Sequence, residues 1–277
     1  MSQSTAFDPG AFRDFEKTGW HMAAHRYADF FPAITSQAVE PLLEAVGARP
    51  GVRLLDVASG PGNGTSAAAA CGANSIGLDF APVMVAKARS LLPAVTFLVG
   101  DAEDLPFADA SFDAVMTNFG LLHLAQPEKA LREFLRVLRP GGRVGFVVWA
   151  TPDEAKGFGI LLKSIEANGN INVPLPPGPP FFRYGEPDAC REVLAEAGFA
   201  EPMVKTIPQL WRLPSPDSMV EAFMEATVRT GGLLRAQSPE ALGKILAAVR
   251  DGCKPYAKAD GSIELPMPAV LAWARKI

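Results

Sequence analysis

The sequence is short of the residues that mark several common classes of protein. It has three cysteines, an odd number with no CxxC spacing, so it predicts neither a disulfide framework nor a zinc site. No apolar run reaches the roughly 18 residues that a membrane span needs. The N-terminal stretch MSQSTAFDPGAFRDFEK has acids and Pro-Gly where a signal peptide has an apolar segment. We therefore expect a cytoplasmic protein with reduced thiols.

Clusters of basic residues are also missing. The chain has 26 lysines and arginines against 30 acids, a net charge of −4, and no basic run interleaved with aromatics. This balance predicts no nucleic-acid partner. The three histidines are His21, His25 and His123. The first pair lacks the acid of an HExxH motif and no acidic trio marks a magnesium site, so no metal is expected.

What the sequence does contain is a long alternation of strands and helices. The chain has 277 residues, 48% of them hydrophobic, enough for a large α/β core. Between residues 51 and 150, apolar strands alternate with helical stretches. The predicted strands are VRLLDVA, SIGLDF, VTFLVGD, FDAVMTNFG and RVGFVVWA. Such βαβ alternation predicts a mostly parallel, doubly wound sheet with helices on both faces.

The two ends of the chain are less regular. Residues 19–46 are predicted to be helical, with Trp20, Ala24, Tyr27 and Phe31 on one stripe. NVPLPPGPPFF is too rich in proline for a helix or a central strand, and MVKTIPQLWRL is predicted as one strand. Residues 215–250 are predicted as two helices that divide at Gly231-Gly232. The closing stretch IELPMPAVLAWARK has prolines that favour an irregular or edge strand.

The stretch LLDVASGPGNGT combines an acid at a strand end with a glycine loop. Such a loop lets backbone N–H groups approach a ligand closely. The dinucleotide fingerprint G-x-G-x-x-G/A has glycine or alanine where Thr65 stands here, and a P-loop needs a lysine that is absent. Neither pattern explains Asp56. One alternative is that Asp56 only caps a structural element.

The order acid, apolar residue, small residue, x, Gly, x, Gly, x, Gly resembles motif I of the class I S-adenosylmethionine-dependent methyltransferases. Ala58 stands at the small position, and Gly60 and Gly62 follow. The resemblance implies that the loop passes under the amino-acid and ribose portions of the cofactor. It also implies that Asp56 orders the loop and the cationic end of the ligand.

Later segments match the same family in order. The resemblance implies that Asp79 in GLDF binds both ribose hydroxyls, a role that suits the two acceptor oxygens of a carboxylate. It implies that Asp101 in GDAEDLPF faces the adenine amine, that Ala102 adds a backbone contact, and that Asn118 lies beside the methyl group. Asp79 as a helix N-cap and Asp101 as a solvated loop acid are the structural alternatives. The predicted cofactor-binding residues are Tyr27, Asp56, Ala58, Gly60, Gly62, Asp79, Phe80, Met84, Asp101, Ala102 and Asn118.

The chain is similar to the small-molecule branch that includes the ubiquinone/menaquinone C-methyltransferases. The resemblance, which covers about residues 50–150, implies methyl transfer from S-adenosylmethionine to an O, N or C nucleophile of a small molecule. His123 and His25 are the candidate general bases, although both also suit structural roles. The alternatives are a non-catalytic S-adenosylmethionine-binding protein and an NAD-dependent oxidoreductase, the latter disfavoured by Thr65 and Asp56.

The matched core and the segments left over on either side of it set the expected architecture. We expect a Rossmann-like, doubly wound, seven-stranded sheet in a single domain over 1–277. Residues 1–48 are predicted to form a helical cover that includes Tyr27, and 50–150 the cofactor-binding core. Residues 151–277 are predicted to complete the sheet and to carry an acceptor lid at about 214–260, before the last strand. Trp211 and Phe223 are expected to wall the acceptor pocket.

Overall fold

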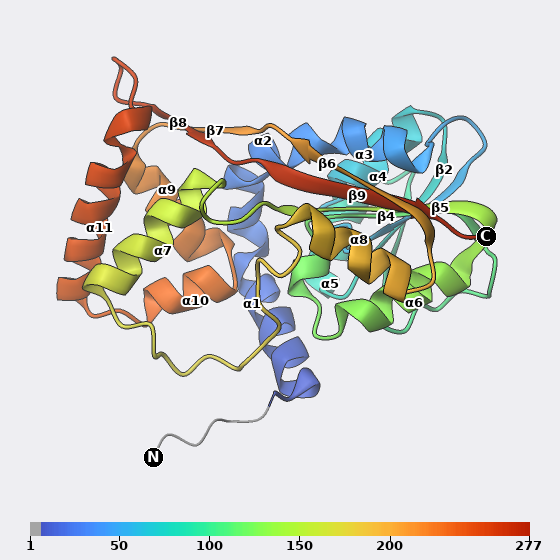
Figure 1. The fold of residues 1–277 in the computed structure, drawn as a ribbon, viewed down its shortest axis with the longest axis horizontal. Coiled ribbons are helices and arrows are strands. Elements are labelled where there is room, and N and C mark those ends of the chain that lie inside the picture. The colour runs from blue at the N-terminus through green and yellow to red at the C-terminus, as the bar shows by residue number, and fades with distance from the viewer. Residues whose placement is uncertain (1–6) are drawn as a thin grey trace. The chain divides into compact units, whose positions relative to one another are not determined.

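The computed structural model describes residues 7–277, and its contacts divide the chain into two compact units (Figure 1). Unit 1 comprises residues 7–34, Ala150–Gly178 and Pro208–Pro268. Unit 2 comprises Thr35–Trp149, Pro179–Ile207 and Ala269–Ile277. Each unit is therefore built from three separate stretches of sequence.

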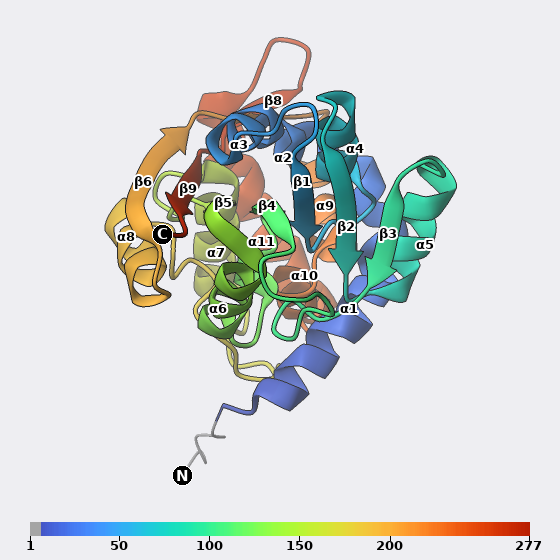
Figure 2. The ribbon, with the colours of Figure 1, turned by 90° about the vertical axis from the view of Figure 1, so that its right-hand side faces the viewer.

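Unit 2 contains a seven-stranded sheet in the order β3-β2-β1-β4-β5-β9-β6 (Figure 2). The first five strands in this order run parallel, and β9 pairs antiparallel with both β5 and β6. The strands are β1 (Arg53–Val57), β2 (Asn74–Asp79), β3 (Thr96–Val99), β4 (Phe112–Asn118), β5 (Leu138–Trp149), β6 (Ala200–Ile207) and β9 (Ala269–Arg275). The predicted Rossmann-like, doubly wound, seven-stranded sheet is confirmed.

Helices cover both faces of this sheet because its central strands are apolar on both sides. Leu54, Leu55 and Val115 are fully buried. In Figure 1, α3 and α4 lie above the sheet, and α6 and α8 lie below it. The helices of unit 2 are η1 (Ser36–Ala38), α3 (Val39–Val46), α4 (Asn63–Ala70), α5 (Pro82–Leu91), η2 (Leu121–His123), α6 (Pro127–Val137) and α8 (Pro187–Glu196).

Two predictions about the later strands are wrong in part or in whole. In the closing segment, Ile263–Pro266 is an edge strand of a two-stranded sheet, as predicted, but Ala269–Arg275 forms β9 between β5 and β6 and is not an edge strand. Its prolines, Pro266 and Pro268, precede the strand, so every residue within it keeps its backbone donor. MVKTIPQLWRL is also not one strand. It divides at Pro208 into β6 of unit 2 and β7 (Leu210–Leu213) of unit 1.

Unit 1 is mainly helical. Its elements are α1 (Pro9–Phe30), α2 (Pro32–Thr35, which ends at the boundary with unit 2), α7 (Lys156–Asn168), β7, α9 (Pro216–Ala226), α10 (Arg229–Arg235), α11 (Pro239–Cys253), η3 (Lys254–Tyr256) and β8 (Ile263–Pro266). Strands β7 and β8 pair antiparallel. Among the described residues, no helix is long and apolar enough to cross a membrane.

Packing and capping in unit 1 correct the predicted helix boundaries. The first helix begins at Pro9 rather than near residue 19, because the Asp8 carboxylate accepts hydrogen bonds from the N–H groups of Gly10 and Ala11. Residues 215–250 form parts of three helices, and Gly231-Gly232 lies inside α10 instead of dividing two helices.

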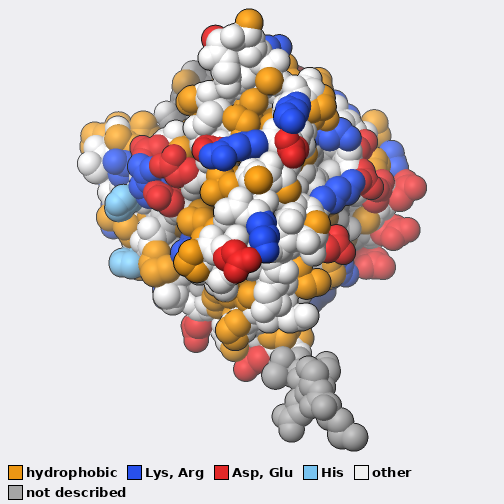
Figure 3. Space-filling view, turned by 90° about the vertical axis from the view of Figure 1, so that its left-hand side faces the viewer, with side chains coloured by type: hydrophobic (Ala, Val, Ile, Leu, Met, Phe, Trp, Pro, Cys, Tyr) orange, Lys and Arg blue, Asp and Glu red, His pale blue; other side chains and the backbone are white. Residues whose placement is uncertain are grey.

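Aromatic rings fill the core of unit 1. Trp211 and Phe223 are buried, with ring centroids 5.3 Å apart, and Phe31 lies 5.3 Å from Trp211 and 6.0 Å from Phe223. The surface is different. On the face that Figure 3 shows, basic and acidic side chains lie side by side. Helix α11 takes part in one exposed ion pair, between Arg250 and Asp217 of α9 at 2.6 Å.

Candidate functional site

The predicted cofactor acids meet at one edge of the sheet in unit 2. Asp56 lies one residue before the end of β1, and Asp79 and Asn118 are the last residues of β2 and β4. Asp101 follows two residues after β3. Strand β1 pairs with β2 on one side and β4 on the other, so the strand order reverses there. In parallel α/β sheets, ligands bind at the carboxyl ends of the strands beside such a reversal.

Asp56 is an ionisable group deep in the protein, with 2% of its surface exposed. The Thr65 hydroxyl donates a hydrogen bond to Oδ2 of Asp56 at 2.7 Å. Burial raises the pKa of Asp56 to about 7; the Thr65 hydrogen bond opposes this shift, and the negative charge of Asp79 adds to it. A Cβ at Gly64 would lie 2.9 Å from Asp56 Oδ2, so the carboxylate fits only against glycine.

The loop after β1 follows a left-handed backbone path. Gly60 has φ +52° and Gly62 has φ +94°. Ala58 also has φ +56°, which is costly for a residue with a Cβ. A Cβ built on Gly120 would lie 2.5 Å from the Cβ of Ala58. Gly120 therefore packs closely against Ala58, and residue 58 has room only for a small side chain. A Cβ on Gly60 would meet no atom within 4 Å, so the loop is open to a ligand on that side.

Asp79 ties this loop to the second strand. Its Oδ2 accepts a hydrogen bond from the Gly60 N–H at 2.8 Å, and its Oδ1 accepts one from the Ala81 N–H at 2.9 Å. Burial raises the pKa of Asp79 to about 6, while these hydrogen bonds and the nearby His123 imidazole oppose the shift. Each carboxylate oxygen has two acceptor sites, so Asp79 retains capacity for two further donors.

The arrangement of the two acids fits S-adenosylmethionine. No lysine or arginine of residues 7–277 forms an ion pair with Asp56 or Asp79. A cationic ligand that also offers hydroxyl donors would supply the charge and the hydrogen bonds that these buried carboxylates lack. S-adenosylmethionine has a sulfonium, an ammonium and a ribose diol.

The third strand leads into a turn that begins at Asp101. Oδ1 of Asp101 accepts a hydrogen bond from the Glu103 N–H at 2.8 Å, and the Asp104 N–H donates to the Asp101 carbonyl at 3.2 Å. Ala102 is buried in this turn. On the neighbouring segment, Phe80 is half-buried directly after β2 and Met84 is buried in α5.

Asn118 carries an unsatisfied group at the end of β4. Its Nδ2 donates to the Thr35 carbonyl at 3.0 Å, but its buried Oδ1 has no hydrogen-bond partner among the described residues. Such an orphan costs about 1–3 kcal/mol, which a bound donor would offset. The next residue, Phe119, has φ +58°, a strained conformation of the kind that gathers at functional sites.

The two candidate histidines lie in different units. His123 is half-buried in η2, directly after β4, with its ring 5.7 Å from that of Phe181. His25 is exposed on α1 in unit 1. Tyr27, on the same helix, has its ring 5.5 Å from Trp20 and 5.6 Å from Phe31.

Sequence reasoning missed the contribution of Thr65. This residue was noted only as a departure from the dinucleotide fingerprint, whereas its buried hydroxyl holds Asp56. The signal was a hydroxyl residue in the first turn of the helix that follows the glycine loop. As for metals, the described residues contain no group of three or more histidine, cysteine or acidic side chains that could hold an ion.

Comparisons with known proteins identify the family of this chain. A family model described as a methyltransferase domain matches residues 55–146. The chain is 46% identical over 110 residues to the demethylmenaquinone methyltransferase of Beutenbergia cavernae, which is 40% of this chain and 46% of that protein. It is 39% identical over 167 residues to that of Thermus thermophilus, covering 53% of this chain and 74% of that protein.

The chain spans about half the length of most of the curated demethylmenaquinone methyltransferases that it matches. Its fold is also similar to a solved structure of phosphoethanolamine N-methyltransferase 2 from Haemonchus contortus in complex with phosphomonomethylethanolamine and S-adenosylhomocysteine. The TM-score is 0.57 at 19% identity, over 96% of this chain and 60% of that one.

Proposed function

This chain belongs to the class I S-adenosylmethionine-dependent methyltransferase family, and from that premise we propose that it transfers a methyl group to a small-molecule acceptor. The acceptor atom is an oxygen, nitrogen or carbon. The observation that carries the proposal is the pair of buried carboxylates at the reversal of strand order, Asp56 and Asp79, which form no ion pair with a lysine or arginine of residues 7–277. A cationic cofactor stabilises such a pair.

The proposed contacts to the cofactor follow the strand ends. Asp56 faces the ammonium end, and Asp79 accepts hydrogen bonds from both ribose hydroxyls with its remaining lone pairs. Asp101 accepts a hydrogen bond from the adenine amine, and Asn118 Oδ1 lies near the transferred group. Loop and wall contacts come from Ala58, Gly60, Gly62, Phe80, Met84 and Ala102.

For the chemical step, bound S-adenosylmethionine would supply a methyl group already activated on sulfur. The protein then has to align the acceptor, exclude water and remove a proton where the acceptor needs it. We assign the proton acceptor to His123, because it follows β4 and acts electrostatically on Asp79. Exposed His25 is the second candidate, and an amine acceptor that is already deprotonated needs neither.

Unit 1 carries the remaining parts of the proposal. Tyr27 covers the cofactor, and Trp211 and Phe223 contribute to the acceptor wall, with a lid at about 214–260. The three cysteines are free thiols, which supports a reducing, cytoplasmic location. The division into a cover over 1–48, a core over 50–150 and a lid-bearing remainder belongs to this proposal.

Calorimetric titration with S-adenosylmethionine, S-adenosylhomocysteine and NAD tests the cofactor. We expect affinities in the micromolar range for the first two, roughly −8 kcal/mol, and none for NAD. Asp56→Asn should weaken binding, whereas Glu44→Gln, an exposed change on α3, should not. A chain that binds NAD but neither sulfur ligand is not a methyltransferase. Release of S-adenosylhomocysteine with a panel of small-molecule acceptors separates an enzyme from a binding protein.

A further inference from the structure

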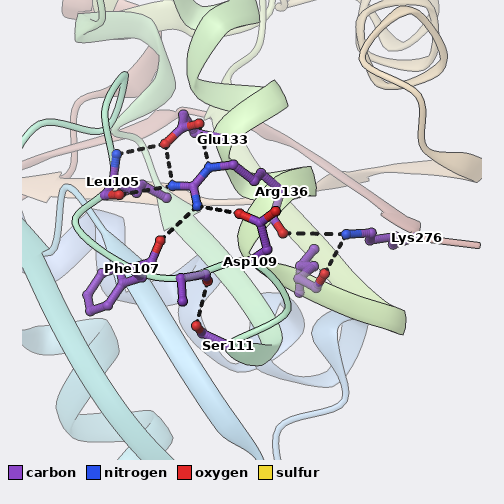
Figure 4. Close-up of polar contacts among 9 residues, drawn as sticks. Leu105, Phe107, Asp109, Ser111, Glu133, Arg136 and Lys276 are labelled. Carbon is purple, nitrogen blue, oxygen red and sulfur yellow. Dashed lines mark hydrogen bonds and ion pairs between the residues drawn. The ribbon is translucent and has the colours of Figure 1, made fainter.

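One arginine of unit 2 uses every hydrogen-bond donor that it has (Figure 4). Arg136 lies in the last turn of α6, and its five N–H groups are the full complement of a guanidinium. Nε and Nη2 donate to the Glu133 carboxylate at 2.8 and 2.7 Å. Nη2 also donates to the Leu105 carbonyl at 2.9 Å. Nη1 donates to the Phe107 carbonyl at 2.7 Å and to Asp109 Oδ1 at 2.9 Å.

All the partners of the Arg136 guanidinium outside its own helix lie in one loop, residues 105–109. The helix holds this loop at further points. The Leu105 N–H donates to Glu133 Oε2 at 2.8 Å, and the Ala110 N–H donates to the Arg136 carbonyl at 3.2 Å. The segment between β3 and β4 is thus fastened to α6 through both its backbone and a side chain.

This loop continues directly from the turn that contains Asp101. Inside the turn, Asp101 accepts hydrogen bonds from the N–H groups of Glu103 and Asp104. The turn contacts α6 and the residue before it through Glu103, which accepts a hydrogen bond from the Gln126 N–H at 2.8 Å, and through Leu105, which contacts both Glu133 and Arg136. These contacts with α6 help to fix the turn that carries the Asp101 carboxylate.

We propose that Arg136 and Glu133 are positioning residues that set the adenine selectivity of the cofactor site by fixing the Asp101 turn. This inference rests on the proposed function, in which Asp101 accepts a hydrogen bond from the adenine amine. Arg136 and Glu133 do not touch the ligand. They act through the loop at Leu105, and a displaced Asp101 no longer distinguishes an amine from a carbonyl on the purine ring.

Two features separate this role from general support of the fold. The Arg136 and Glu133 side chains are 31% and 19% exposed, and ion pairs this accessible add little to stability. The planar fork is also essential. Lysine has three donors on one nitrogen and cannot reach all four partners, two backbone carbonyls and two carboxylates, so the contacts require an arginine rather than a positive charge.

The test compares the affinity for S-adenosylhomocysteine with that for S-inosylhomocysteine, which has a carbonyl in place of the adenine amine. We expect the wild-type protein to prefer the adenine ligand by about 10-fold or more, the effect of one hydrogen bond to a charged group. Arg136→Lys and Glu133→Gln should each reduce this preference at least about threefold. Arg132→Met, an exposed change on the same helix with no hydrogen bond or ion pair in the described chain, should leave it unchanged.

A purely structural role gives a different pattern, in which both affinities fall by the same factor and the preference is kept; that result overturns the inference. Asp101→Ala supplies a second readout, because in that background Arg136→Lys should not change the preference further. A change that persists there contradicts positioning through Asp101. Should the wild-type protein bind neither ligand, the proposed function fails and the inference with it, whereas binding without preference overturns the inference alone. Arg136→Lys and Glu133→Gln keep the helix propensity, and circular dichroism checks that both variants fold.

Discussion

One buried amide of unit 1 and two buried carboxyls of unit 2 differ in how their polar groups are satisfied. In unit 1, the amide of buried Gln237 accepts a hydrogen bond from the Asn170 N–H at 2.7 Å and donates to the Asn170 and Leu233 carbonyls at 2.7 and 2.9 Å. In unit 2, the buried carboxyls of Asp56 and Asp79 have pKa values that rise to about 7 and about 6. A satisfied neutral amide holds the chain together, whereas buried carboxylates cost stability. Under the proposed function, Gln237 serves the fold and the two acids serve a ligand.

The largest effect that we expect is a loss of stability as the pH rises. Asp56 and Asp79 have folded-state pKa values above the usual 3.8, so between pH 4 and 7 the folded state binds more protons than the unfolded state. Stability is therefore greatest at low pH with respect to these groups and falls as the pH rises toward about 6 to 7. The fall should reach about 4 kcal/mol for Asp56.

Denaturant unfolding at several pH values measures this slope. Asp56→Asn should flatten it, and saturating S-adenosylhomocysteine should offset it at pH 7 and above. Glu44→Gln, an exposed acid-to-amide change, should keep the wild-type slope. If Asp56→Asn leaves the slope unaltered, burial does not raise the pKa of Asp56 in the folded state. The contrast with the satisfied Gln237 amide of unit 1 is then wrong.

Replacement of Asp79, the second buried acid of unit 2, tests the same comparison through ligand affinity. Asp79→Ala should weaken S-adenosylhomocysteine by roughly 1–3 kcal/mol, because it leaves the ribose hydroxyls and the Gly60 N–H without an acceptor. Calorimetric titration measures the loss. Unchanged affinity removes Asp79 from the site.

The matching change in unit 1 should act on stability alone. Gln237→Ala should lower the free energy of unfolding by about 1–2 kcal/mol, because the N–H and carbonyl of Asn170 lose their partner. Cofactor affinity should stay within about twofold of wild type, as for independent sites. Glu240→Gln, at an exposed position on α11, is the control. A large loss of affinity in Gln237→Ala breaks the division between structural amide and functional acid.

Tyr27 tests whether unit 1 contributes to the cofactor at all. Tyr27→Ala should weaken S-adenosylhomocysteine by about 1 kcal/mol, the scale of one aromatic contact, and should reduce the protection that the ligand gives against limited proteolysis. His21→Ala, an exposed change on the same helix, is the reference. Intact affinity and turnover in Tyr27→Ala show that the N-terminal helix only packs.

The smallest effect concerns metal. Activity should survive treatment with EDTA, because residues 7–277 contain no cluster of metal-ligating side chains. Methyl-transfer assays before and after dialysis against the chelator measure this. A loss that magnesium restores reveals a site built from scattered acids.

Prediction from sequence succeeded where local pattern and tertiary position coincide. In unit 2, each strand is a short apolar run, and the polar residue at its end must lie at the carboxyl edge once the strands are parallel. Asp56, Asp79 and Asn118 were placed at strand ends in this way. It failed for β9, because proline content was used as if it applied to the whole segment, whereas Pro266 and Pro268 both precede the strand.

What the sequence alone determined is the alternation of elements, the glycine loop and the acids that follow the strands, since each depends on neighbours within a few residues. Only the tertiary structure decided the Thr65–Asp56 hydrogen bond, the left-handed backbone of Ala58 and Phe119, and the hydrogen bonds from Arg136 to residues 105–109. The hydrogen bonds among these features join groups that are up to 31 residues apart, and Ala58 is closely approached by Gly120. The physical reason is that burial and hydrogen-bond partners are properties of the packed chain, and the same acid is an ordinary surface group or a strained site depending on what surrounds it.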